Sequence, residues 1–309
     1  MWSVLRVLER TSSRTTSRIL DRARGCAVDY LRLTKPGSVA LLLFTAFGGM
    51  VVARPELPSW ELLAMTMLGG ALAAGGANTL NCYLDRDLDR LMPRTSGRPL
   101  PAGRVQPSRA LAFGLLLCIL SVTVLAAGVN PLSALLAALG VFYYVVVYTL
   151  WLKRSTPWNI VIGGGAGAMP LLVGSAAATG QLSPLALWLG VVILLWTPPH
   201  FWSLALFRHR EYALVEVPML PVVRGEGETR QQILLYSLLL LLATLLLVPA
   251  QFAGPAFLVA ALLLGSKFVF HAIVLLQRAT LQAARQLYLY SILYLALLFG
   301  ALIVERLIL

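Results

Sequence analysis

Long apolar stretches separated by short polar segments recur along almost the whole chain. Nine of them approach or reach the roughly 20 residues that an α-helix needs to cross the hydrocarbon core of a bilayer. They lie near 38–53, 62–84, 110–128, 131–150, 157–179, 184–207, 233–252, 254–276 and 286–304. The pattern predicts an all-α integral membrane protein, with nine transmembrane helices forming a single domain over residues 36–309.

The composition supports a membrane environment. Of the 309 residues, 59% are hydrophobic and 12% are charged, whereas a soluble domain carries about 25% charged residues. The net charge of +12 could suggest a nucleic-acid partner. We expect no such partner, because the basic residues lie in short segments between the apolar stretches, where membrane topology explains them.

The basic residues also predict an orientation in the membrane. Of the 25 lysines and arginines, 22 fall within residues 1–35 or in a connection after an even-numbered stretch. The exceptions are Arg54, Lys267 and Arg306. The positive-inside rule then places a basic arm, residues 1–35, and these connections in the cytoplasm, and the C-terminus outside. Because the arm is short and carries three acids, we expect a bacterial inner membrane, with the mitochondrial inner membrane as the alternative.

Most acidic residues beyond the arm gather in two of the inner connections, after the second and the sixth apolar stretch. In the first of these, Asn81, Asp85 and Asp89 are spaced four apart. They would share one face if the helix continued to its expected end before Pro93. Asp87 falls off this face.

This spacing indicates a metal–diphosphate site. Two carboxylates one helical turn apart repel each other unless a cation lies between them, and an all-oxygen ligand set suits Mg²⁺. Arg94 and Arg98, also four apart, carry guanidinium groups that match phosphate geometry. The alternative, a solvated charged connection, does not explain the shared face or the second acidic cluster on the same side.

The stripe Asn81-x-x-x-Asp85-x-x-x-Asp89 resembles the first acid motif of the UbiA superfamily of intramembrane prenyltransferases. Within it, the chain resembles more closely the protohaem IX farnesyltransferases, over roughly residues 28–305. The segments that carry this resemblance are "LTKPG" at 33–37, "DRDLDRLMPRTSGRPLPAGRV" at 85–105, "YTLWLKRSTPWNIVIGGGAGAMP" at 148–170, "PPHFWSLALFRHREYALVEVPMLPVVRGEGETRQQI" at 198–233 and "LYLYSILYLALLF" at 287–299.

The resemblance implies a bundle of nine transmembrane helices around a central cavity. It further implies that Mg²⁺ bridges the protein and a diphosphate. The implied metal ligands are Asn81, Asp85, Asp89 and Glu211, with Arg94, Arg98 and Lys153 as further catalytic residues. Contacts to the substrates are expected from Arg154, Asn159, His200, Arg208 and Tyr212. Arg210 stands where relatives often carry an acid, so either Glu211 acts alone in the second motif or the first motif holds most of the metal.

The implied reaction joins the farnesyl group of farnesyl diphosphate to a vinyl group of protohaem IX, which yields haem O and diphosphate for haem A/O-type terminal oxidases. Haem is then a substrate rather than a cofactor, and a haem A synthase is a candidate recipient of the product. Two alternatives stay open. One is a prenyltransferase with another acceptor, such as a quinone precursor or chlorophyllide, and the other is a membrane transporter.

Two further features have more than one interpretation. His200 follows Pro198 and Pro199, which should kink or unwind the sixth stretch. The imidazole would then either bond the freed carbonyls or contact haem, and His271 is a second candidate for that contact. The glycines at 163–167 serve either close helix packing or room for a flat macrocycle.

Overall fold

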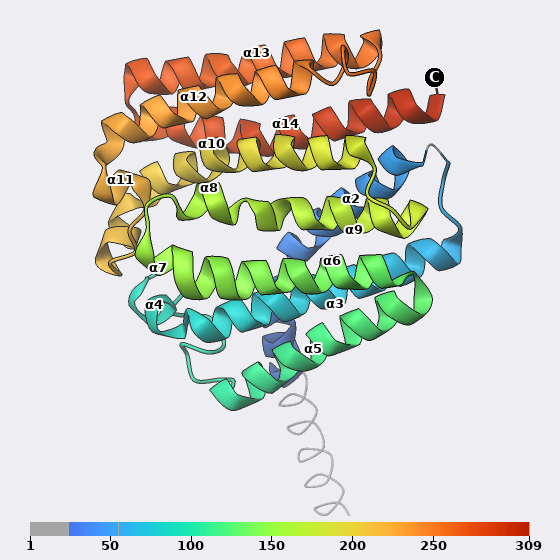
Figure 1. Ribbon diagram of the computed structural model, residues 1–309. Coiled ribbons are helices and arrows are strands. Elements are labelled where there is room, and N and C mark those ends of the chain that lie inside the picture. The colour runs from blue at the N-terminus through green and yellow to red at the C-terminus, as the bar shows by residue number, and fades with distance from the viewer. Residues whose placement is uncertain (1–24, 55, 309) are drawn as a thin grey trace, which may run out of the picture.

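The computed structural model describes residues 25–54 and 56–308, and all the regular secondary structure in this part is helical (Figure 1). Residues 1–24, most of the expected basic arm, lie outside the described residues. Residues 25–34 are helical. The first long helix begins at Pro36, which is the expected boundary between the arm and the membrane domain.

The helices follow one another with short connections. Their bounds are α2 Pro36–Ala53, α3 Trp60–Leu84, α4 Arg86–Leu91, α5 Pro107–Gly128, α6 Pro131–Phe142, η1 Tyr143–Leu152, α7 Lys153–Ser155, α8 Asn159–Gly163, α9 Gly165–Thr179, α10 Pro184–Leu214, α11 Leu220–Val223, α12 Gly225–Leu245, α13 Pro255–Arg278 and α14 Leu281–Ile308. The elements α6, η1 and α7 form one continuous rod, and only Gly164 separates α8 from α9.

Seven helical stretches of the described part are long and apolar enough to cross a membrane. The expectation of a multi-pass membrane protein is thereby confirmed. The other two expected spans, α3 and α12, are not among the seven. Helix α3 is rich in glycine and ends in polar residues, while α12 begins with the polar residues 225–232 and ends at Leu245, earlier than expected. The count of nine spans stays a prediction.

The helices lie side by side, and their polar connections separate into two ends (Figure 1). The short helices α4, α7 and α11 lie together at one end, on the left in Figure 1, and the C-terminus lies at the other. Both acidic clusters therefore lie at the same end of the bundle, and the connections that carry most of the basic residues adjoin them. This arrangement agrees with the sidedness expected from the sequence.

Small residues allow neighbouring helices to approach closely. A Cβ atom at Gly174 of α9 would overlap the carbonyl of Ala46 in α2, so these helices pack backbone against backbone. A Cβ at Gly163 would likewise overlap the ring of Tyr148, and one at Gly164 would lie 3.0 Å from Cβ of Thr197. Close packing is therefore the interpretation that Gly163 and Gly164 support.

The rod 131–155 contains a ten-residue π-helix, η1. Such wider turns are rare and are frequently found at functional sites. Within η1, the hydroxyl of Thr149 donates to the carbonyl of Tyr144, five residues earlier, at 2.8 Å. The π-helix ends at Leu152, directly before Lys153, so its last turns deliver Thr149 and Lys153 to the end of the bundle where the acids gather.

Helix α10 continues without interruption through Pro198 and Pro199, so of the two expected effects, a kink or an unwinding, the unwinding is wrong and the kink stays a prediction. Both prolines are buried, and α10 packs against α9, α12 and α14. Neighbouring helices on several sides can keep a proline-containing segment helical within a membrane.

Candidate active site

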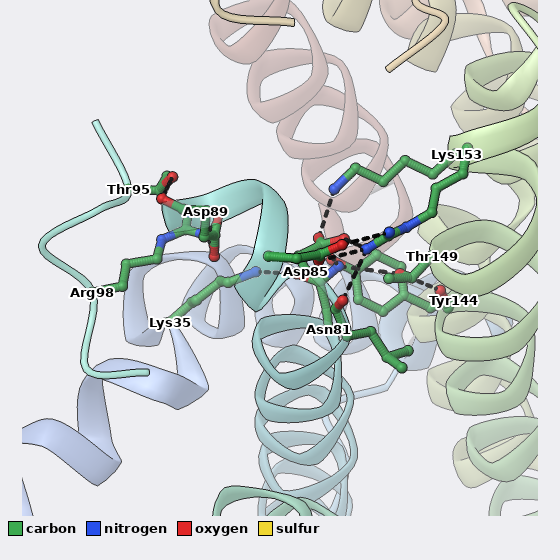
Figure 2. Close-up of polar contacts among 12 residues, drawn as sticks. Lys35, Asn81, Asp85, Asp89, Thr95, Arg98, Tyr144, Thr149 and Lys153 are labelled. Carbon is green, nitrogen blue, oxygen red and sulfur yellow. Dashed lines mark hydrogen bonds and ion pairs between the residues drawn. The ribbon is translucent and has the colours of Figure 1, made fainter. Parts of the chain in front are cut away.

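Asn81 and Asp85 form the buried centre of the site at the C-terminal end of α3 (Figure 2). The Asn81 amide nitrogen donates to Oδ2 of Asp85 at 2.8 Å and to the hydroxyl of Thr149 at 3.1 Å. Nζ of Lys153 lies 2.6 Å from the same Asp85 oxygen. The other oxygen, Oδ1, is buried, and no residue of 25–54 or 56–308 is a hydrogen-bond partner for it. Asp85 therefore keeps one oxygen free for a ligand.

Lys35 completes this cluster from the segment before α2. Its Nζ donates to Oδ1 of Asn81 at 2.7 Å, and burial lowers the pKa of its ammonium. The backbone at Lys35 is left-handed, with φ 53°, which is costly for a residue that precedes a proline. Lys35 lies within the segment "LTKPG" but is not among the site residues predicted from the sequence. The only signal was a lysine directly before the first span.

The end of the predicted arm also packs on the bundle. Nε of Arg104 donates to both carboxylate oxygens of Asp29, at 3.1 and 3.0 Å, and Arg104 donates to the carbonyl of Gly97 as well. These bonds fasten the connection after α4 to residues 25–34. Together with Lys35, they show that the last part of the expected arm belongs to the structure around the site.

Asp89 lies apart from Asp85 (Figure 2). The amide of Asp89 still donates to the carbonyl of Asp85 at 2.8 Å, but α3 ends and α4 begins at Asp85, where φ is −87° and ψ is 4°. Both oxygens of Asp89 accept from Nη1 of Arg98, at 2.9 and 2.7 Å. The expected stripe thus divides into two ionic clusters. Helix α4 ends at Leu91, before Pro93 as expected.

Asp87 is off the stripe, as the spacing indicates. It is exposed and accepts two hydrogen bonds from Arg154, at 2.8 and 2.9 Å, and this guanidinium lowers the pKa of Asp87 to about 2. Arg154 also donates to the carbonyl of Leu84 and lies 3.9 Å from the free oxygen of Asp85. A cavity of about 270 Å³ opens beside this pair, lined by Leu84, Arg86, Asp87, Leu150 and Arg154.

Arg94, in the connection after α4, contacts Glu211 of the second acidic cluster. Nε of Arg94 lies 3.5 Å from Oε2 of Glu211, and Nη1 of Arg208 lies 2.5 Å from Oε1 of the same carboxylate. Oε2 of Glu211 is buried and has no hydrogen-bond partner in the described part of the chain. Arg94 therefore joins the connection after α4 to the C-terminal part of α10.

Two other expected residues lie buried at this end. Asn159, at the start of α8, donates to the carbonyl of Thr156 at 2.6 Å, and its buried Oδ1 has no hydrogen-bond partner within the described ranges. Tyr212 is buried next to Glu211 in the sequence. His200 stands off from the ionic clusters, because its Nδ1 is 2.7 Å from the hydroxyl of Ser291 in α14.

The residue types at this end suit an anionic ligand with a metal ion. Within residues 25–54 and 56–308, no group of three His, Cys, Asp or Glu side chains is close enough to hold a metal. Mg²⁺ does not need such a group, since one or two carboxylates, water and substrate phosphates complete its shell. The free oxygens of Asp85 and Glu211 fit that role. Nearby ammonium and guanidinium groups suit phosphate oxygens.

The comparison with protein families finds a match to the UbiA prenyltransferase family over residues 42–299. The chain is 49% identical over 292 residues to a protoheme IX farnesyltransferase of Roseiflexus castenholzii, which covers 94% of this chain and 55% of that protein. It is 50% identical over 279 residues to a protoheme IX farnesyltransferase of Symbiobacterium thermophilum. The aligned part covers 90% of this chain and 93% of that protein. The chain thus spans about half the length of the former relative and most of the latter.

Solved structures share the fold at low sequence identity. A structure described for digeranylgeranylglyceryl phosphate synthase is similar with a TM-score of 0.78 and 16% identity, over 92% of this chain and 99% of the other. A UbiA homolog from Archaeoglobus fulgidus bound to GPP and Mg²⁺ is similar with a TM-score of 0.64 and 17% identity, over 89% and 99%. At these identities, the comparison establishes the architecture of the bundle.

Proposed function

The chain belongs to the UbiA prenyltransferase family, and from that premise we propose that it transfers the farnesyl group of farnesyl diphosphate to a vinyl group of protohaem IX. The products are haem O and diphosphate. The observation that carries the proposal is about 50% identity, over nearly the full length of both chains, with a protein named protoheme IX farnesyltransferase. The clustered acids and bases at one end of the bundle supply the groups that a diphosphate leaving group requires.

Mg²⁺ is the proposed metal, and Asp85 and Glu211 are the residues that would hold it. Each has a buried carboxylate oxygen without a hydrogen-bond partner among the residues that the structure describes, and the A. fulgidus homolog with the same fold was solved with Mg²⁺. When bound, the metal would neutralise charge on the diphosphate. Asn81 and Asp89 are proposed to support this site. Their side-chain oxygens are engaged by Lys35 and Arg98.

Most of the residues proposed to act on the leaving diphosphate are basic. The allylic C–O bond breaks, and its electron pair leaves with the diphosphate. Lys153 and Arg154 lie beside Asp85, and Arg94 and Arg208 lie beside Glu211, so both groups of cations can stabilise the growing negative charge. Arg98 can contribute once a ligand competes for its contact with Asp89.

The new carbon–carbon bond forms between the farnesyl carbocation and a vinyl carbon of haem. Water then adds to the cation next to the porphyrin, and a proton is released, which leaves a hydroxyfarnesylethyl group. Apolar helix faces would hold the farnesyl tail, and Asn159 and Tyr212 are proposed to contact the substrates. We further propose a bacterial inner membrane with the site on the cytoplasmic side, and a haem A synthase as a recipient of the product.

Product analysis tests the proposal directly. Membranes that contain the protein are incubated with farnesyl diphosphate, Mg²⁺ and protohaem IX, and the haem is analysed by mass. The expected result is a haem enlarged by one farnesyl group and one hydroxyl group. Parallel reactions offer an aromatic quinone precursor or chlorophyllide as the acceptor. No product from haem together with product from another acceptor would contradict the assignment of haem.

A further inference from the structure

One face of α10 carries aromatic side chains toward the acid motif. Trp196, His200, Phe207 and Glu211 share this face, because residues four, seven and eleven apart fall close together around a helix. With a rise of 1.5 Å per residue, His200 lies about 16 Å from Glu211 along the axis. This face of α10 therefore leads from the middle of the helix to the end of the bundle where the ionic groups gather.

The contacts of Trp196 and Thr197 place this face inside the bundle. Trp196 donates through Nε1 to the carbonyl of Ser291 in α14, at 2.9 Å. Thr197 lies against Gly164, between α8 and α9. His200 projects between these two contacts. Helix α2 packs against α9, α10 and α14, so this face is directed toward α2. Trp196 and His200 are nevertheless only partly buried.

The hydrogen bonds around Ser291 determine which nitrogen of His200 carries the proton. The Ser291 hydroxyl donates its single proton to the carbonyl of Tyr288, at 2.6 Å. Nδ1 of His200 lies 2.7 Å from the same hydroxyl oxygen and must therefore be the donor. A neutral imidazole carries one N–H group, so Nε2 has a free lone pair. No hydrogen bond within the described residues reaches Nε2.

Two aromatic rings fix the direction of that lone pair. The imidazole is stacked between Trp196, at 4.3 Å and 16°, and Tyr288, at 4.9 Å and 26°. Rotation of the imidazole ring about the Cβ–Cγ bond of His200 would break both stacks and the hydrogen bond to Ser291. A histidine with Nδ1–H anchored and Nε2 unprotonated is arranged as metal-binding histidines are in proteins.

We propose that Nε2 of His200 is the axial ligand of the haem iron, and that Ser291 is the positioning residue that sets its tautomer. The proposal rests on the proposed function for the identity of the acceptor. Histidine is a common axial ligand of haem, and binding at this point would hold the macrocycle inside the bundle, with the ionic end of α10 beyond its edge.

The surroundings of His271 distinguish it from His200. His271, on α13, is tilted against the ring of Tyr290 at 5.0 Å, and the ammonium of Lys267 lies over the same ring at 5.1 Å. Among the described residues, no hydrogen bond fixes either nitrogen of His271. The sequence left open which of the two histidines contacts haem. The proposal selects His200, and His271 serves as the matched control.

A haem titration without farnesyl diphosphate tests the proposal. The purified protein in lipid nanodiscs is titrated with ferric haem B, and absorption and electron paramagnetic resonance spectra are recorded. We expect the wild type and His271→Ala to give the same histidine-ligated spectrum. His200→Ala should lose that spectrum and regain it when imidazole is added. Ser291→Ala should bind haem about tenfold more weakly, the effect of losing a partner that orients a metal ligand.

The outcomes separate this proposal from the proposed function. A histidine-ligated spectrum in a folded His200→Ala or His200→Gln protein would overturn the proposal, even if the wild type farnesylates haem. Folding is checked by thermal unfolding and size-exclusion chromatography, and Ser291→Ala serves as a second test if both His200 variants fail to fold. If the wild type binds haem through His200 but produces no farnesylated haem, the proposed function fails and the binding site stands.

Discussion

Asp85 uses only one of its two carboxylate oxygens. Oδ2 accepts from both Asn81 and Lys153, while Oδ1 is buried and receives no hydrogen bond from the part of the chain that the structure describes. Leaving a buried carboxylate oxygen without a partner is costly, and such a group in a native protein requires an explanation. A ligand bound during the reaction is the explanation that fits the surrounding charges.

We expect Asp85→Asn to lower the rate of farnesyl transfer by about 100-fold, the effect of removing one electrostatic group from an active site. The substitution also leaves the ammonium of Lys153 without its counterion. Product formation is measured by mass in membranes with matched amounts of protein. The control is Glu226→Gln, a half-exposed carboxylate at the same end that pairs with Arg230 and should leave the rate unchanged. Full activity in Asp85→Asn would contradict the proposed metal site.

Asp87 gives a prediction about pH. Arg154 lowers the pKa of Asp87 to about 2 in the folded protein, against about 3.9 in an unfolded chain. Because the pKa of Asp87 is lower in the folded protein than in the unfolded chain, its ionised carboxylate adds to the free energy of unfolding. This contribution is complete above about pH 4 and is lost as the pH falls toward 2. We expect the unfolding temperature of the wild type to fall more than that of Asp87→Asn between pH 5 and pH 2.

The Asp87 effect should be small, because the side chain is 58% exposed and exposed ion pairs contribute little. High salt serves as the control, since it screens exposed charges and should bring the two pH profiles together. Identical profiles at low salt would show that the pair with Arg154 contributes nothing to stability.

At the scale of elements, the contact between α2 and α9 depends on glycine. We expect Gly174→Ala to destabilise the protein by about 1–3 kcal/mol, the usual cost of overpacking, because the added methyl group meets the backbone of Ala46. The matched control is Gly300→Ala in α14, where nothing lies within 4 Å of the added atom. The measurement is thermal unfolding in detergent. Equal unfolding temperatures for the two variants would contradict the close packing of α2 on α9.

The apolar pattern predicted most helices within a few residues. Length and hydrophobicity dominate the formation of helices in a membrane, and the starts at Pro36, Pro131 and Pro184 agree closely with the sequence. The π-helix η1 could not be predicted, because its turns depend on packing against neighbours. The continuity of α10 through Pro198 was missed for the same reason.

The residue types of the candidate site were predictable, but their pairing was not. The spacing placed Asn81 and Asp85 together, and both lie in one hydrogen-bonded cluster. The separation of Asp89 depends on the change of backbone direction at Asp85, and the entry of Lys35 depends on its left-handed backbone. Neither conformation has a local signal, since both are stabilised by contacts between segments far apart in the sequence.

At the scale of the whole molecule, the proposed orientation can be tested by labelling. In a variant without the three native cysteines, a single cysteine is introduced at Ser96, after α4, or at Gln251, after α12. In intact cells, a membrane-impermeant maleimide should label the cysteine at 251 and not that at 96. Both should react once the membrane is permeabilised. Labelling at 96 in intact cells would reverse the orientation.

The gathering of the ionic groups at one end of an otherwise apolar bundle has a consequence for how the proposed reaction would finish. Its two products prefer different solvents: diphosphate partitions into water, and a farnesylated haem partitions into lipid. A site on the boundary between the two phases lets each product leave toward its own solvent. Departure in opposite directions would lower the chance that the products meet again, so phase separation itself would help to keep the reaction from reversing.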